Sequence, residues 1–339
     1  MNLKLFRGAR RIWLRFALTL LSIGIAGASV VLYMTSMPGK SFSGALPPLS
    51  AEESEISFNL NKHVANIAGT IGERNVIAYE PLQRTAQYVE DALKAQGYEV
   101  RSQEYVVRMR KVRNLTAEIH GGARANEIVI VGAHYDTVFD CPGADDNTSG
   151  VAALLELARL LKSSHPARTV RFVAFVNEEP PHFQTENMGS WVYAKEAHRK
   201  KENIVAALSI ETIGMYLDAE GSQQYPEGFK SLYPSKGDFI AFIGNLSSRG
   251  LVRDAVRSFR KSVQFPSEGS AVPGWIAGVG WSDHWSFWQE GYPAIMVTDT
   301  APFRNRNYHE PTDRPDTLDY GRMAKVVHGL AGVITDLGK

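Results

Sequence analysis

Three short apolar segments, each followed by a histidine or an acidic residue, constrain the fold of this chain most. They are residues 127–133, 170–176 and 204–210. Each has the length and nearly continuous apolar character of a β-strand that is buried on both faces. Helical patterns lie between them, and such alternation predicts an α/β fold with a mixed, mainly parallel β-sheet sandwiched by helices.

The same alternation extends over most of the 339 residues, starting near residue 54. Amphipathic or apolar periodicity predicts the helices, and β-branched or aromatic runs between turn residues predict the remaining strands. The expected helices are 81–96, 150–163, 188–199 and 318–336, and the further strands are 98–107, 112–120, 239–243 and 294–298.

The residues that follow the three apolar strands are of the metal-binding type. His134 and Asp136 come after the first strand, Glu178 and Glu179 after the second, and Glu211 after the third. Ligands of open α/β sheets bind beyond the carboxyl ends of the strands. Small polar residues would be sufficient at an edge that only meets water. The pattern therefore predicts a metal site at this edge of the sheet, built from imidazole and carboxylate ligands.

Taken singly, each of these motifs is also compatible with a purely structural role. His134 and Asp136 share a face, and a carboxylate often orients a metal-bound imidazole, but a hydrogen-bonded structural histidine has the same signature. Asp145, Asp146 and Asn147 lie in the segment 143–150 that opens a helix, where one of them is expected to cap it. Two carboxylates are more than capping requires.

Adjacent Glu178 and Glu179 repel each other unless a cation or a shared proton offsets the repulsion. One could bind a metal while the other acts as general base toward a water molecule, although an exposed acidic pair is the alternative. Two histidines near the C-terminus are further candidate ligands. His284 is surrounded by tryptophans, which favours packing, whereas His309 lies in a polar, proline-rich loop.

The order of these motifs resembles the di-zinc aminopeptidases, a family that includes bacterial leucyl aminopeptidases and glutamate carboxypeptidases. The resemblance covers about residues 55–335 and implies the zinc-exopeptidase (phosphorylase/hydrolase-like) fold. It also implies two Zn²⁺ ions per chain. His134 would bind one ion and His309 the other, Asp146 would bridge them, Glu179 and Glu211 would complete the ligands, Glu178 would be the general base, and Asp136 would orient His134.

The chain departs from this family at Glu211, where aspartate is usual, and a glutamate reaches about one methylene further. The segment 121–127 is too short to hold the extra protease-associated domain of some members.

The resemblance implies a zinc-dependent exopeptidase that acts on peptides, most simply an aminopeptidase. A glutaminyl-peptide cyclase with one zinc is the alternative enzyme, and the doubled acid of residues 145–146 argues against it. A non-catalytic ectodomain of the same fold is a third possibility. Such proteins lose ligands, whereas here every ligand position holds a competent side chain.

The first 53 residues predict a membrane anchor and a linker. Residues 1–15 form a basic segment, residues 16–34 are uncharged and long enough to span a bilayer, and residues 35–53 are rich in Ser, Pro and Gly. The basic flank is expected to stay in the cytoplasm, so that the exopeptidase domain, residues 54–339, is exported to the periplasmic or extracellular side. Cleavage after Ala28, as in a signal peptide, is the alternative.

The remaining composition adds two expectations. The net charge is +1, and the first 40 positions hold six basic and no acidic residues, so the basic character belongs to this segment and we expect no nucleic-acid partner. Cys141 is the only cysteine, so no internal disulfide can form. The sequence contains no signal for an oligomeric state.

Overall fold

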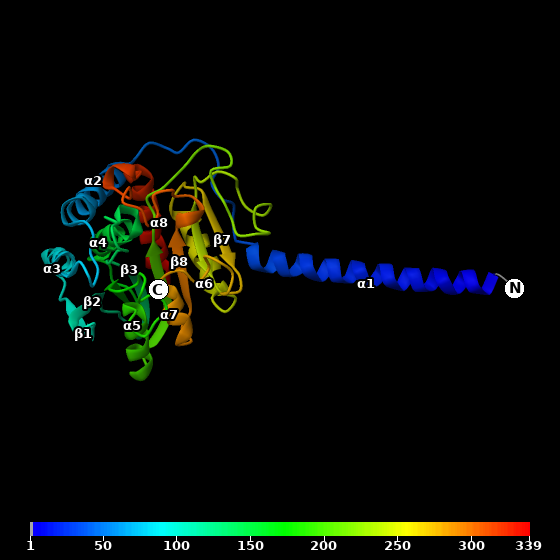
Figure 1. Cartoon of the computed structure of the whole chain (residues 1–339), viewed down its shortest axis with the longest axis horizontal. Helices are drawn as coiled ribbons and strands as arrows, with labels where there is room; N and C mark the ends of the chain where they lie inside the picture. Colours follow the sequence, from blue (N-terminus) through cyan, green and yellow to red (C-terminus); the bar gives the residue numbers. More distant parts are fainter. Residues whose placement is uncertain (1–2) are drawn as a thin grey trace. The chain divides into compact units, whose positions relative to one another are not determined.

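The computed structural model describes the backbone of residues 3–339 and the side chains of residues 13–339 (Figure 1). The chain divides into two compact units, with the boundary between Ser36 and Met37. The first unit consists of helix α1 (Leu3–Thr35). Within the described residues, Trp13–Thr35 is the one stretch long and apolar enough to cross a membrane, and a signal sequence would share these properties. The basic side chains at positions 4, 7, 10 and 11 lie outside the described side chains.

The second unit is built on a single sheet, in which the described residues contribute eight strands. Their order is β1-β2-β4-β3-β5-β8-β6-β7. The central strands β4, β3, β5 and β8 are parallel, β2 and β6 run antiparallel to their inner neighbours, and β7 is parallel to β6. The strands are β1 (Arg101–Val107), β2 (Arg110–Ile119), β3 (Arg124–His134), β4 (Arg168–Phe175), β5 (Asn203–Glu211), β6 (Ile240–Gly244), β7 (Ser267–Ala271) and β8 (Ala294–Thr298).

Helices cover both faces of this sheet, so the expected α/β architecture is confirmed (Figure 1). The first group, which packs over the larger hydrophobic core, is α2 (Ala51–Val64), α3 (Tyr79–Ala95), α4 (Gly150–Leu161), α6 (Arg249–Ser262) and α8 (Tyr320–Leu337). On the other face, α5 (Gly189–Arg199) and α7 (His284–Gln289) cover a smaller core. Apolar side chains alternate between these two cores along the central strands, as in a sheet buried on both faces.

Several elements were not among those expected from the sequence, including strand β7 and helices α6 and α7. The strand consists of Ser, Glu, Gly, Ser and Ala, so it carries neither β-branched nor aromatic residues. It forms because its backbone pairs with β6 at the edge of the sheet. The connection between β2 and β3 spans only residues 120–123, so no extra domain is inserted there.

The segment expected to be a linker lies against the domain instead. The backbone N–H of Ser267, on edge strand β7, donates to Ser41 Oγ over 2.9 Å. The guanidinium of Arg260 donates to the backbone oxygens of Pro38 and Gly39. Met37 packs against the core. The compact unit therefore begins at Met37 rather than near residue 54, because irregular chain of this composition can satisfy the polar groups of a sheet edge as well as water does.

Candidate active site

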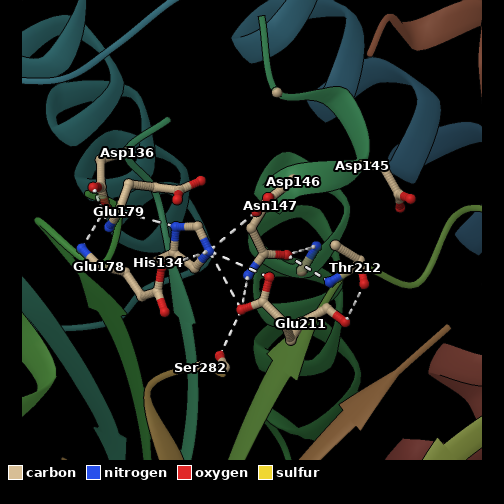
Figure 2. A network of polar contacts seen from close by, with 12 residues as sticks. His134, Asp136, Asp145, Asp146, Asn147, Glu178, Glu179, Glu211, Thr212 and Ser282 are labelled. Carbon is tan, nitrogen blue, oxygen red and sulfur yellow. Dashed lines mark hydrogen bonds and ion pairs between the residues drawn. The ribbon is translucent and has the colours of Figure 1, made fainter. Parts of the chain in front are cut away.

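The carboxyl ends of three adjacent strands bring the predicted residues together (Figure 2). His134 is the last residue of β3, Glu211 is the last residue of β5, and Glu178 and Glu179 follow β4. Since β3 lies between β4 and β5, His134 stands at the centre of the group. All four residues are at least 95% buried, so their charges are largely shielded from water.

Asp146 divides the ligand-type groups into two sets. Its Oδ1 lies 3.3 Å from Nε2 of His134, and its Oδ2 lies 3.1 Å from Nε2 of His309. Nε2 of His134 is also 3.3 Å from Glu211 Oε2, and Nε2 of His309 is 3.3 Å from Glu179 Oε2. Each set thus contains one imidazole, one glutamate and one oxygen of the shared aspartate.

The nitrogen and oxygen atoms of this cluster lie close together, but several of them lack a hydrogen-bond partner. Asp146 Oδ1, Glu179 Oε1 and His309 Nε2 are buried without a hydrogen-bond partner. Ligand atoms of His134, Asp146 and Glu179 lie within 4.8 Å of one another. Buried polar atoms are normally hydrogen-bonded, so such a set of orphans is unusual, and a bound cation would satisfy it. Imidazole nitrogen and carboxylate oxygen are the donors that zinc accepts, and the residues present therefore fit this metal.

The electrostatics of the cluster agree with a cation site. Burial and the nearby Asp146 carboxylate raise the pKa of Glu179 to about 8, against the contacts with His309. Burial would also raise the pKa of Asp146, but hydrogen bonding and charge from His134 and His309 hold it well below its usual range. Burial lowers the pKa of His309, yet Asp146 and Glu179 raise it to about 10. Without a metal, protons must compensate this excess of carboxylates.

Glu178 is placed to act on a reacting group. Its Oε2 lies 3.9 Å from Nε2 of His134, and the side chain is buried beside the ligand-type atoms. Burial raises its pKa well above the usual range, and the charges of Glu179 and Glu211 add to this against the effect of His134. A carboxylate whose pKa is raised toward neutrality is suited to accept and return a proton.

Asp136 connects the two halves of the site. Its Oδ1 lies 3.6 Å from Nδ1 of His134, on the far side of the ring from Asp146. Its two oxygens also accept hydrogen bonds from the backbone N–H groups of Glu178 and Glu179, each at 3.1 Å. Asp136 therefore positions the acidic pair in addition to facing the imidazole.

Two residues that the sequence analysis did not single out hold the loop of Asp146. Asp313 accepts hydrogen bonds from the backbone N–H groups of Asp145 and Asp146. Arg74 is fully buried and donates to the backbone oxygens of Tyr135 and Gly143 and to other groups of this loop. Asp313 belongs to the same short segment as His309, which was a usable signal, whereas nothing around Arg74 in the sequence marks it.

Glu211, the departure from the usual aspartate, is held by its own partners. Ser282 Oγ donates to Oε2 of Glu211 over 2.5 Å, and Asn147 Nδ2 approaches the same oxygen at 3.4 Å (Figure 2). Ser282 in turn contacts Ser209 Oγ at 2.7 Å. These contacts fix the longer side chain, so that its second oxygen faces His134 at 3.4 Å.

The second candidate histidine is part of the packing. His284 is fully buried, its Nε2 lies 2.7 Å from the backbone oxygen of Val279, and its ring meets Trp288 edge-on. Burial lowers its pKa to about 4, so the ring is neutral. The neighbouring Asp283 is also fully buried.

Comparison with known sequences connects this geometry with a peptidase family. The sequence profile of peptidase family M28 matches residues 114–334. An uncharacterized protein of Escherichia coli, YfbL, is 39% identical over 280 residues, which cover 80% of this chain and 85% of that protein. Curated relatives that are named aminopeptidases are covered over 18% to 58% of their own length.

Solved structures share the fold at low sequence identity. BSAP, a zinc aminopeptidase from Bacillus subtilis, superimposes with a TM-score of 0.66 and 14% identity, over 87% of this chain and 96% of that one. A glutaminyl cyclase from Fimbriiglobus ruber superimposes with a TM-score of 0.61 and 21% identity, over 88% of this chain and 99% of that one. The same fold thus occurs in an aminopeptidase and in a glutaminyl cyclase, so only the residues of the site can distinguish the two activities.

Proposed function

Because this chain belongs to peptidase family M28, we propose that it is a zinc-dependent aminopeptidase, which removes residues from the N-terminus of peptides. The observation that carries the proposal is the position of Asp146, whose two oxygens face the two different imidazoles of His134 and His309. This arrangement supports two zinc ions per chain. His134, Glu211 and Asp146 would hold one ion, and His309, Glu179 and Asp146 would hold the other.

The residues of this chain divide the chemistry among themselves. Bound zinc would supply a Lewis acid that polarises the scissile carbonyl and acidifies water. Glu178 accepts the proton of the attacking water and returns it to the leaving amine, a role for which its raised pKa is suited. Asp136 keeps Glu178 in place through the backbone and faces the His134 ring from behind. His309 is 32% exposed, but the other residues of the cluster are buried, which strengthens these interactions.

A Glu178→Gln substitution tests this assignment. The amide keeps the size of the side chain but cannot accept the proton, so we expect kcat to fall about a thousand-fold, as for other lost general bases. Zinc content, measured by atomic emission on protein purified without chelator, should remain at the wild-type value. Turnover is measured on aminoacyl-coumarin amides.

Glu186→Gln is the matched control, because Glu186 is an exposed glutamate on the loop that follows the acidic pair. It should retain wild-type activity and zinc. Near-normal turnover of Glu178→Gln would remove Glu178 from the proposed role. Loss of zinc in Glu178→Gln would instead make it a ligand.

The alternative, cyclisation of N-terminal glutamine, is suggested by the shared fold with the glutaminyl cyclase. The two sets of donor atoms around Asp146 favour two metals and hydrolysis. Metal analysis and a glutaminyl-peptide assay decide between them. One zinc per chain together with release of ammonia from a glutaminyl peptide would establish the cyclase.

The N-terminal helix supports an enzyme that is attached to a membrane. Residues 16–34 anchor the chain in the membrane, the basic residues before them stay in the cytoplasm, and the peptidase domain lies on the exported side. The substrates are therefore peptides outside the cytoplasm.

A further inference from the structure

A row of four residues crosses the sheet from the metal-type cluster to its edge. The strand register pairs Glu211 with Thr298, Thr298 with Ala241, and Ala241 with Glu268. Directly paired residues point to the same face of a sheet, so all four side chains lie on one side. All four also line a single pocket, which therefore has Glu211 at one end and Glu268 at the other.

The register also gives the length of this pocket. Neighbouring strands are about 4.8 Å apart, so the three steps from β5 to β7 separate the backbones of Glu211 and Glu268 by about 14 Å. The two residues between them, Thr298 and Ala241, are small and leave the floor of the pocket open. The proposed metal ligands occupy one end of the pocket, and the Glu268 carboxylate occupies the other. The space between them fits a long, unbranched side chain.

The walls of the pocket are apolar and aromatic. Loops and the short 3-10 helix Ala301–Phe303 cover the sheet here. They contribute Tyr225, Phe229, Tyr233, Trp281 and Phe303. Such walls suit the methylene stem of a substrate side chain. The polar partners for the tip of that side chain lie mainly at the Glu268 end of the pocket.

Glu268 is an acidic group without an ion-pair partner among the described residues. The nearest cation, Arg260, uses its guanidinium on oxygens of Ser267, Pro38 and Gly39. Burial raises the pKa of Glu268 above its usual value, against the effects of Arg260 and of the nearby Ser41 hydroxyl. A half-buried carboxylate in this position is stabilised by any cation that enters the pocket.

A second polar group lies close to the first. The next row across the sheet pairs Met296 with Ile243 and Ile243 with Ser270, and all three also line the pocket. Ser270 is 4% exposed, and its Oγ has no hydrogen-bond partner. The pocket therefore ends in a carboxylate and an unused hydroxyl, two groups that accept hydrogen bonds.

We propose that Glu268 determines the substrate specificity of this enzyme by selecting peptides whose first residue is arginine or lysine. This inference rests on the proposed aminopeptidase function. The methylene stem lies along Thr298 and Ala241 between the aromatic walls, and the cationic tip binds Glu268 with Ser270 beside it. Leucine, which is shorter and neutral, offers no cation to Glu268 and no donor to Ser270.

The test compares aminoacyl-coumarin amides of arginine, lysine and norleucine with the full chain in detergent and zinc. Norleucine has the stem of lysine without its charge. We expect kcat/KM for the cationic substrates to exceed that for norleucine about 10- to 100-fold, the usual contribution of a hydrogen bond to a charged group. Glu268→Gln should reduce this ratio to near one.

Glu227→Gln is the matched control, an exposed glutamate on the same covering loop that does not line the pocket. It should keep the wild-type ratio, which excludes a general effect of surface charge. A wild-type ratio near or below one overturns the inference without any variant. A high ratio that persists in Glu268→Gln overturns the role of Glu268.

Calorimetric titration of the zinc-loaded protein with free arginine and free norleucine tests the specificity pocket separately from the aminopeptidase function. Tighter binding of arginine that depends on Glu268, with no hydrolysis of any substrate, supports the pocket and overturns the aminopeptidase function. Hydrolysis of norleucyl and arginyl substrates at equal rates, with equal binding, overturns the specificity alone.

Discussion

At the scale of single residues, the contacts around the cluster matter as much as its donor atoms. Asp136 and Asp313 each accept hydrogen bonds from two backbone N–H groups. The hydroxyl of Ser282 donates a hydrogen bond to Glu211. Carboxylates with partners of this kind are held in one rotamer, so the spacing of the proposed ligand oxygens is fixed by the protein itself. Such outer contacts change metal affinity when they are removed.

Ser282→Ala tests this point at the most unusual ligand. Without the hydroxyl, Glu211 loses its closest partner and is free to change rotamer, so we expect the affinity of one of the two zinc ions to fall about 10- to 100-fold. The second ion should be unaffected, because Glu179 and His309 do not contact Ser282. Titration against a competing chelator measures both constants. Ser286→Ala is the control, since Ser286 is equally buried but contacts Ser190. Equal affinities in Ser282→Ala and wild type would refute the role of Ser282.

Much of the candidate site could be predicted from the sequence, and the reason is local. His134, Glu179 and Glu211 follow recognisable buried strands, and parallel strands place their carboxyl ends at one edge. Arg74 could not be predicted in this way. Its partners include backbone oxygens of residues distant in the chain. Because every residue has a backbone oxygen, the sequence does not indicate which of them bind Arg74.

At the scale of elements, helix α2 is held at its first turn by a buried charge. Glu53 caps the helix by accepting from the backbone N–H of Ser50, while Ser50 Oγ accepts from the N–H of Glu53. The same carboxylate accepts from Lys325 of α8 at 3.1 Å. Burial opposes ionisation of Glu53, but these partners lower its pKa below the usual 4.5. Glu53 therefore connects two helices of one layer.

Glu53→Gln should lower the free energy of unfolding by about 3 kcal/mol at pH 7, because it leaves the buried ammonium of Lys325 without its counter-ion. A group with a lowered pKa in the folded state stabilises the fold above its ordinary pKa and loses that contribution as the pH falls through its folded value. The difference between variant and wild type should therefore shrink below about pH 4. Urea denaturation at pH 7 and pH 3 measures it. Glu52→Gln, an exposed neighbour, should cost little. A loss that is the same at both pH values would contradict the ionic origin.

The elements themselves were predicted with uneven success. The central strands have the apolar runs that burial on both faces demands, and each was expected near its observed position. Strand β7 was missed because its residues are small and polar and its pairing with β6 is a tertiary effect. The missed strand is the one that carries Glu268, so the pocket could not be foreseen.

At the scale of the whole molecule, the boundary between the two units follows Ser36 rather than the start of α2. Composition alone does not distinguish a free linker from a docked one, and the segment after the anchor was expected to be free. Its contacts with Arg260 and with the N–H of Ser267 make it part of the folded domain.

Truncation distinguishes the two boundaries. A chain that starts at Met37 should leave the membrane fraction and keep the stability of the domain. A chain that starts at Ala51 should lose about 2 to 4 kcal/mol of unfolding free energy, from the apolar contact of Met37 and the hydrogen bonds to the segment. Urea unfolding of the two chains measures the difference. Equal stability would show that the segment is not required for the fold.

The segment that covers the edge of β7 has a consequence for the life of the protein in the cell. It begins at Met37, beyond both the apolar helix and Ala28. A protease that released the chain at Ala28 would thus leave this cover in place, and the exposed strand would not be offered to other chains as a template for aggregation. A tethered and a released form would then carry the same folded domain, and processing would change only whether that domain meets its substrates near the membrane surface or throughout the compartment.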